Sequence, residues 1–163
     1  MTDAKGRNGA RDFDFLFGSW RIANRRLASR LTGCTEWGAF SALLTCQPVL
    51  GGIGNIDSFT PVDWAGREGF EGGALRLYDR EQGVWRIWWM TNASGELDAP
   101  VIGRFVDGVG AFYCDDMHEG QPVQCRFLWH DIRPDSAAWE QALSPDGGAT
   151  WETNWVMSFT RVR

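Results

Sequence analysis

The side chains that could bind a metal ion are concentrated in one short segment. Asp115, Asp116 and His118 combine two carboxylates with an imidazole, and divalent cations accept both ligand types. The segment has the alternating pattern of a strand, in which neighbouring residues point to opposite faces. Asp115 and Asp116 therefore cannot both reach one ion inside the protein. We expect a solvated hairpin end here and no metal site.

Motifs for nucleophilic or phosphate chemistry are missing from the sequence. There is no G-x-S-x-G motif, and the glycines of Gly51–Gly54 precede an apolar run rather than a helix that could bind phosphate. The cysteines lack the C-x-x-C spacing of metal and redox sites, so we expect reduced thiols and no cofactor. They are Cys34, Cys46, Cys114 and Cys125.

An enzyme built from this sequence would have to work without a cofactor, on one buried acid or amide. Glu140, Tyr113 and Asn154 are the candidates, because a carboxyl, phenol or amide group in an apolar cavity can move a proton or orient a substrate. The matching activities are those of a cyclase, an isomerase or a hydratase. A carboxyl group with a raised pKa inside the cavity would favour this alternative.

Aromatic side chains are the most unusual feature of the composition. Ten of the 163 residues are tryptophan and ten are phenylalanine. In a strand at residues 84–92, Trp85 and Trp89 share one face, with Trp88 and Met90 on the other. Apolar walls with a few polar groups are typical of small-molecule cavities. We predict a cavity whose walls include Trp85, Trp89, Phe112, Phe127, Trp129 and Trp155.

Two alternatives stay open for these aromatic residues. Trp139 and Trp151 belong to other strands, so the indoles could simply fill the interior and leave no cavity. Trp88 and Met90, on the outer face, could be covered by a second copy of the chain, since aromatic residues and methionine are enriched in interface cores. A homodimer and a monomer are equally compatible with the sequence.

Short apolar runs separated by turn signals indicate an all-β protein. Phe13, Leu16 and Phe17 have helical spacing, and Gly18 stops this short helix. The absence of helical patterns between the later runs excludes a parallel α/β sheet. We predict about ten strands in one antiparallel up-and-down β-barrel, with residues 1–10 as a flexible tail and 11–163 as the domain. The expected strands lie near residues 19–31, 35–46, 49–60, 69–78, 84–92, 100–106, 109–117, 122–132, 136–144 and 150–162.

Two tight turns predict the register of three strands. Asp107-Gly108 is the strong signal for a type I′ turn, and it places Gly103 opposite Phe112. A second two-residue turn at 119–120 places Cys114 opposite Cys125. One face of these strands is then apolar, and we expect it to point inward, although the mixed opposite face is an alternative lining. The apolar face holds Val101, Gly103, Phe105, Gly110, Phe112, Cys114, Val123, Cys125, Phe127 and Trp129.

The charge and hydropathy of the chain exclude several classes of partner. Sixteen basic and 21 acidic residues give a net charge of −5, which argues against nucleic acid, because its binding depends on lysine and arginine. No apolar run is long enough to span a membrane, and we expect no membrane insertion. The polar start of the chain lacks the apolar stretch of a signal peptide, so we expect a cytoplasmic protein.

The segment Gly18-Ser19-Trp20, which follows the short helix, resembles the calycin (lipocalin-like) superfamily. In those barrels the tryptophan closes one end, and an arginine of the last strand often lies across its ring. This resemblance implies that role for Trp20 with Arg161 or Arg163. With a hairpin at 78–85 and an Asp-box-like turn at 144–151, residues 13–162 resemble lipocalin-like bacterial domains of unknown function.

Nitrobindin-like barrels are similar in size, also begin with G-x-W, and hold haem through a histidine on a late strand. The last predicted strand here has no histidine. His130 would have to face inward, against the predicted register, and His118 lies in a predicted turn.

The leading hypothesis is a non-catalytic, lipocalin-like barrel that binds a small apolar or amphipathic molecule, whose head group an arginine or asparagine would orient. The competing hypotheses are the cofactor-free enzyme described above and a small dimeric scaffold with a filled core.

Overall fold

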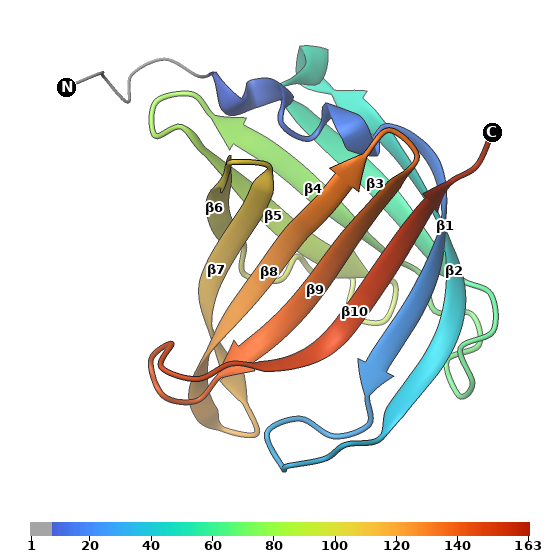
Figure 1. The fold of residues 1–163 in the computed structure, drawn as a ribbon, viewed down its shortest axis with the longest axis vertical. Helices are drawn as coiled ribbons and strands as arrows, with labels where there is room; N and C mark the ends of the chain where they lie inside the picture. The colour runs from blue at the N-terminus through green and yellow to red at the C-terminus, as the bar shows by residue number, and fades with distance from the viewer. Residues whose placement is uncertain (1–7) are drawn as a thin grey trace.

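The computed structural model describes residues 8–163, and Figure 1 shows its fold. In this part of the chain, ten antiparallel strands form one closed barrel in which each strand pairs with its neighbours in sequence and β1 pairs with β10. The prediction of a ten-stranded up-and-down barrel is therefore confirmed. The strands are β1 (Gly18–Leu27), β2 (Trp37–Val49), β3 (Gly54–Pro61), β4 (Gly72–Asp79), β5 (Val84–Thr91), β6 (Val101–Val106), β7 (Val109–His118), β8 (Gln121–Arg133), β9 (Ser136–Ser144) and β10 (Glu152–Arg161).

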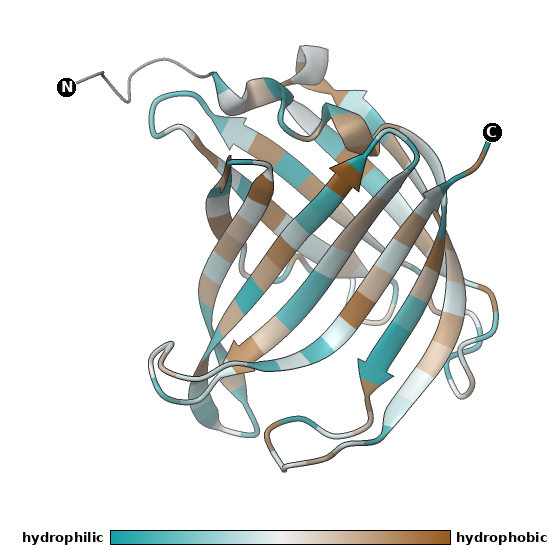
Figure 2. Cartoon of the chain, viewed as in Figure 1, coloured by the Kyte–Doolittle hydropathy of each residue, from teal (hydrophilic) through white to brown (hydrophobic). Residues whose placement is uncertain are grey.

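The strands form because apolar residues recur at every second position and one face of each strand is buried. In β1, Trp20, Ile22 and Asn24 are buried, whereas Arg21 and Ala23 between them are exposed. Figure 2 shows the same alternation of hydrophobic and hydrophilic bands along most strands. The buried face of every strand lines the inside of the barrel, where the main hydrophobic core lies.

The predicted hairpins of β6, β7 and β8 are confirmed in register and in direction. Gly103 pairs with Phe112, and Cys114 pairs with Cys125. The first turn has positive φ angles of 50° at Asp107 and 80° at Gly108, as a type I′ turn requires. A Cβ atom at Gly103 would lie 1.8 Å from the carbonyl oxygen of Ala111, so only glycine fits there. The apolar face points inward: Phe112 is completely buried.

The N-terminal segment differs from the predicted single helix. It forms two 3-10 turns, η1 (Gly9–Arg11) and η2 (Asp14–Leu16), because Phe13 between them departs from helical geometry with φ −94° and ψ 4°. A third such turn, η3 (Leu50–Gly52), joins β2 to β3. Figure 1 shows the N-terminal turns lying across one end of the barrel. No helix in the described residues is long and apolar enough to cross a membrane.

Contacts with the barrel begin before residue 11. Of the expected tail, residues 1–7 lie outside the described part of the chain. Gly9 and Ala10 are buried. The amide of Gly9 donates a hydrogen bond to the Tyr78 hydroxyl at 3.1 Å, and Trp85 Nε1 donates to the Gly9 carbonyl at 3.0 Å. Two residues of the expected tail therefore contact the barrel, although the polar sequence before Arg11 carries no periodic signal.

Trp20 and Arg161 close this end of the barrel as the calycin resemblance implies. Trp20 is completely buried, and its Nε1 donates a hydrogen bond to the Leu16 carbonyl at 2.8 Å. The Arg161 guanidinium lies 4.1 Å from the centre of the Trp20 ring. It also donates to the carbonyls of Phe17 and Phe15, both at 2.6 Å, and to a third carbonyl in the β8–β9 turn. These contacts join the first strand, the last strand and the N-terminal turns.

The outer face of β5 leaves Trp88 and Met90 half-buried. A single chain does not test whether a second copy covers them, so the homodimer stays a prediction.

Replacing Arg161 with alanine should lower the free energy of unfolding by about 2–3 kcal/mol, because it removes charge-assisted hydrogen bonds and a cation–π contact. Urea denaturation followed by circular dichroism measures this change. Arg163→Ala is the matched control, because Arg163 is exposed and pairs only with Asp135, also at the surface. Equal effects of the two substitutions would show that the closed end does not depend on Arg161.

Candidate functional site

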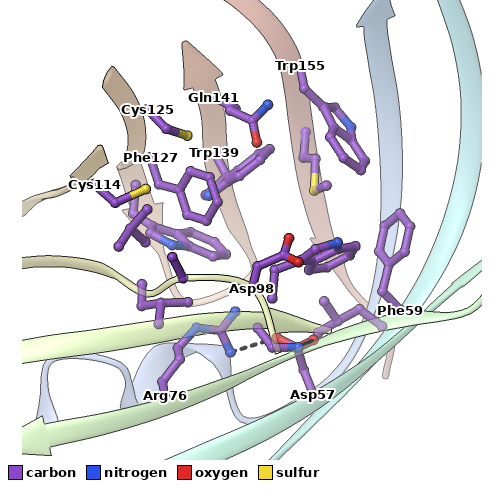
Figure 3. Close-up of a pocket in the computed structure, with 18 of the residues that line it drawn as sticks. Asp57, Phe59, Arg76, Asp98, Cys114, Cys125, Phe127, Trp139, Gln141 and Trp155 are labelled. Atoms are coloured by element: carbon purple, nitrogen blue, oxygen red, sulfur yellow. Dashed lines mark hydrogen bonds and ion pairs between the residues drawn. The ribbon is translucent and has the colours of Figure 1, made fainter. Parts of the chain in front are cut away.

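A cavity of about 300 Å³ lies inside the barrel. Its size is at the lower end of the range typical for small-molecule sites. Figure 3 shows aromatic side chains around much of its wall, with a few polar groups among them. The aromatic lining residues are Phe59, Trp89, Phe127, Trp129, Trp139, Trp155 and Phe159. The interior is therefore not completely filled by side chains.

Four of the six predicted wall residues line this cavity, namely Trp89, Phe127, Trp129 and Trp155. Trp85 and Phe112 point inward but belong to the packed end beneath the N-terminal turns. Both pack against the Phe13 ring, at 5.0 Å from Trp85 and 5.7 Å from Phe112 between ring centres, and neither lines the cavity. Strand periodicity indicates the face on which a residue lies. How far the N-terminal turns and the side chains packed beneath them extend into the barrel decides which inward-facing residues border the cavity.

Trp139 and Trp151, the two further tryptophans considered, have different positions. Trp139 lines the cavity from β9. Trp151 lies on the outer face, where the Arg126 guanidinium is 4.5 Å from its ring and Tyr113 packs beside it. Trp151 therefore does not belong to the interior cluster of indoles.

Two of the three candidate catalytic residues do not reach the cavity. Glu140 lies on the outer face of β9, with its Oε2 atom 3.4 Å from Nε2 of His130. Tyr113 is 46% exposed, on the outer face of β7. Because His130 also lies outside, it does not have the inward position that haem ligation would require. Asn154 is completely buried at a bulge in β10 and accepts a hydrogen bond at 2.8 Å from Gln141, which lines the cavity.

The sequence analysis missed a buried ion pair on the cavity wall. Asp57 of β3 and Arg76 of β4 both line the cavity, and their side chains are only 2% and 5% exposed. Arg76 Nη1 lies 2.6 Å from Asp57 Oδ2 and donates a hydrogen bond to Asn55 Oδ1 at 2.9 Å. The backbone amide of Ala74 donates to Asp57 Oδ1 at 3.0 Å. These contacts hold the two side chains in fixed positions on the wall.

Two polar atoms at the ion pair lack hydrogen-bond partners. Nε of Arg76 and Nδ2 of Asn55 are buried without a hydrogen-bond partner among the described residues. The Arg76 guanidinium also packs on the rings of Phe13 and Trp129, at 5.2 and 5.9 Å. Figure 3 shows Asp57 and Arg76 side by side on one wall, with Phe127 and Trp155 on the opposite side. The cavity thus has one polar wall in an aromatic enclosure.

Three cysteines lie at or near the cavity. Cys114 and Cys125 line it from paired positions, and both are free thiols. The hydrogen bond between the two thiols lowers the pKa of Cys114 and raises that of Cys125. Cys46 lies beside Asn55, and burial raises the pKa of its thiol to about 12, so it stays protonated. Among the described residues, no group of three or more histidine, cysteine or acidic side chains is arranged to hold a metal ion.

The cavity reaches solvent near the connection between β5 and β6. Its lining includes Asp98, Ala99 and Asp116, which are all exposed residues. Partial burial of its carboxyl group raises the pKa of Asp98, and the charge of Asp116 raises it further. Strands β5 and β6 pair through only three residues each, so this seam of the barrel is short. A small molecule could enter here without crossing a continuous sheet.

No protein-family model matches the sequence, and no curated protein matches it. The closed ten-stranded antiparallel barrel is compatible with a lipocalin-like fold. The function therefore has to be inferred from the cavity itself.

Asp57→Asn or Arg76→Met alone should lower the free energy of unfolding by about 3–5 kcal/mol, because each leaves an uncompensated buried group. The double variant Asp57→Asn/Arg76→Met should lose less than the sum of the two, with a coupling of about 1–3 kcal/mol. Urea denaturation of the four proteins of this cycle measures both quantities. Additive losses would show that the two side chains are not energetically coupled.

Proposed function

We propose that this protein binds a small apolar or amphipathic molecule inside its barrel. The observation that carries the proposal is the cavity of about 300 Å³, which is lined by aromatic rings and has polar groups on one wall. Apolar surface buried against these rings would supply most of the binding free energy, at about 25 cal/mol for each Å² removed from water. The polar wall and the rim would orient the molecule, as the few polar groups of small-molecule sites usually do.

Filling the cavity should abolish binding and leave the fold intact. Val101 is 3% exposed and lines the cavity, so Val101→Phe should weaken ligand binding about tenfold or more, equivalent to at least about 1.4 kcal/mol. Quenching of tryptophan emission measures binding for a panel of fatty acids, terpenoids and aromatic compounds. Tryptophan quenching is a suitable measurement because four of the residues that line the cavity are tryptophans, namely Trp89, Trp129, Trp139 and Trp155.

Ile102→Phe is the matched control, because the neighbouring Ile102 is 38% exposed and faces outward. This variant should bind the panel as the wild type does. Saturable quenching by no member of the panel would contradict the proposed function. Stability provides a second readout, because an added ring in a filled core costs about 1–3 kcal/mol, whereas a ring placed in open space does not. A loss of that size in Val101→Phe would favour the scaffold with a filled core.

A second candidate function, catalysis without a cofactor, is favoured by Asp98. This residue lines the opening of the cavity, and its pKa is raised, which is the direction that a catalytic acid requires. A cyclase, isomerase or hydratase could use it on a molecule held by the aromatic wall. Asp57 and Asp116 also line the cavity, but Asp57 is paired with Arg76 at 2.6 Å.

If Asp98 is an acid–base catalyst, a bound panel member should be converted by the wild type, and Asp98→Asn should lower that rate about 100-fold or more. Mass spectrometry of the recovered ligand, after separation by liquid chromatography, detects the product. Asp115→Asn is the control, because Asp115 is exposed on a neighbouring strand and faces away from the cavity. Recovery of every bound compound unchanged would leave the non-catalytic binder as the function.

A further inference from the structure

Three arginines gather beside the cavity at the end opposite Trp20. Arg26 is the second-to-last residue of β1. Arg30 lies in the connection between β1 and β2, and Arg67 lies in the connection between β3 and β4. Within residues 8–163, no carboxylate lies at ion-pair distance from any of the three. Such a cluster is unexpected in a chain with a net charge of −5.

Arg26 is held in the wall of the barrel rather than in solvent. Its guanidinium lies 4.9 Å from the ring of Trp155 and 5.3 Å from the ring of Trp64. Its Nε is buried and has no hydrogen-bond partner among the described residues. An ordinary surface arginine extends its charged group into water, so its nitrogens are satisfied there. Arg26 instead holds its guanidinium against two indoles, with one N–H group left without a partner.

Arg30 and Arg67 each repel the positive charge of Arg26. Burial lowers the pKa of Arg26 to about 10, and the charges of Arg30 and Arg67 contribute to this decrease. Arg67 also packs on Trp64, 5.3 Å from the ring centre, so the cluster shares one aromatic support. A negatively charged group placed among these side chains would remove the repulsion and supply the missing hydrogen-bond acceptor.

The arginine cluster lies next to residues that line the cavity. Trp155 lines the cavity and also carries Arg26 on its ring. Arg30 interacts electrostatically with Cys125 and Asp116, which line the cavity as well. Asp116 offsets part of the charge of Arg30, so Arg26 and Arg67 carry most of the uncompensated positive charge.

The interior offers no comparable place for an anion. Arg76 on the cavity wall is already neutralised by Asp57 at 2.6 Å. A second carboxylate beside this pair would leave a net negative charge in a buried, aromatic environment, which is costly. An acidic head group would therefore lie at the arginine cluster, with only the uncharged body of the ligand inside.

The volume of the cavity limits the size of that body. A cavity of about 150 Å³ holds one benzene ring. The cavity of about 300 Å³ found here therefore suits a body of two fused rings, or a hydrocarbon chain of similar volume.

We propose that the ligand is an anionic amphipath whose apolar body occupies the aromatic cavity and whose carboxylate, sulfonate or phosphate group binds Arg26, Arg30 and Arg67. This inference rests on the proposed function, because it names the chemical class of the molecule that the barrel binds.

Two probes with the same body test this inference. 2-Naphthol is neutral, and 2-naphthalenesulfonate has the same two fused rings with a sulfonate in place of the hydroxyl group. Calorimetric titration at fixed ionic strength should show that the wild type binds the sulfonate about tenfold or more tightly than the neutral probe. Equal affinities, with both probes bound, would overturn the anionic class and leave the proposed function standing. Binding of neither probe would overturn both.

Variants locate the source of the preference. Arg26→Gln should reduce the preference for the sulfonate to about threefold or less, with little change in affinity for the neutral probe. Arg25→Gln is the matched control, because Arg25 is the preceding residue, is exposed on the outer face and packs on Trp37. Arg67→Gln, in an exposed loop, should cause a smaller loss of the preference for the sulfonate. This variant tests the arginine cluster if Arg26→Gln does not fold. An unchanged preference in Arg67→Gln and a folded Arg26→Gln would overturn the assignment.

A competition experiment separates an amphipath from a free anion. Inorganic phosphate, added at constant ionic strength, should not displace the sulfonate probe, whereas decanoate should displace it better than decanol does. Displacement of the probe by phosphate alone would mean that the arginines bind a free anion, and it would overturn the amphipath.

Discussion

Ten strands closed into one barrel enclose more space than their inward side chains occupy, because eight strands are already enough to hold one small ligand. The protein fills the excess from one end only. The N-terminal turns lie across one end of the barrel (Figure 1). Trp20 and Arg161 pack at this end, and the remaining space becomes the cavity. The position of the cavity is therefore a consequence of how far these packed residues extend along the barrel axis.

The polar groups of the interior are arranged in two separate places with different charge. The Asp57–Arg76 pair on the cavity wall is electrically balanced, and it is anchored by Asn55 and the amide of Ala74. The arginine cluster at the other end is unbalanced, with Asp116 facing only Arg30. Such a division suits a molecule with an uncharged, apolar body and a charged end.

Strand count, the Asp107-Gly108 hairpin and the inward face of β6–β8 could be predicted from sequence, because tight turns fix register and register fixes which side chains point inward. Glu140 was misplaced because no such turn determines the register of β8 with β9, which is interrupted between His130 and Arg133. The register of β3 with β4 could not be predicted from the sequence either. A long connection joins them, so nothing local brings Asp57 to Arg76.

The same reasoning explains which aromatic residues were assigned correctly. Alternation placed Trp85 and Trp89 on the inner face of β5, and both side chains point inward. Only Trp89 borders the cavity, since Trp85 is occupied by its hydrogen bond to Gly9. That contact depends on a polar segment whose sequence shows no regular pattern.

The barrel can open most easily between β5 and β6, because these two strands share the shortest pairing. This seam has the fewest paired residues of the ten seams, and beyond it only a single bridge links Met90 to Leu97. Separating the two strands there breaks few backbone hydrogen bonds, while the plugged end stays anchored. Transient separation of these strands would widen the opening of the cavity beside Asp98 and Ala99. A ligand could then enter or leave without unfolding of the whole protein.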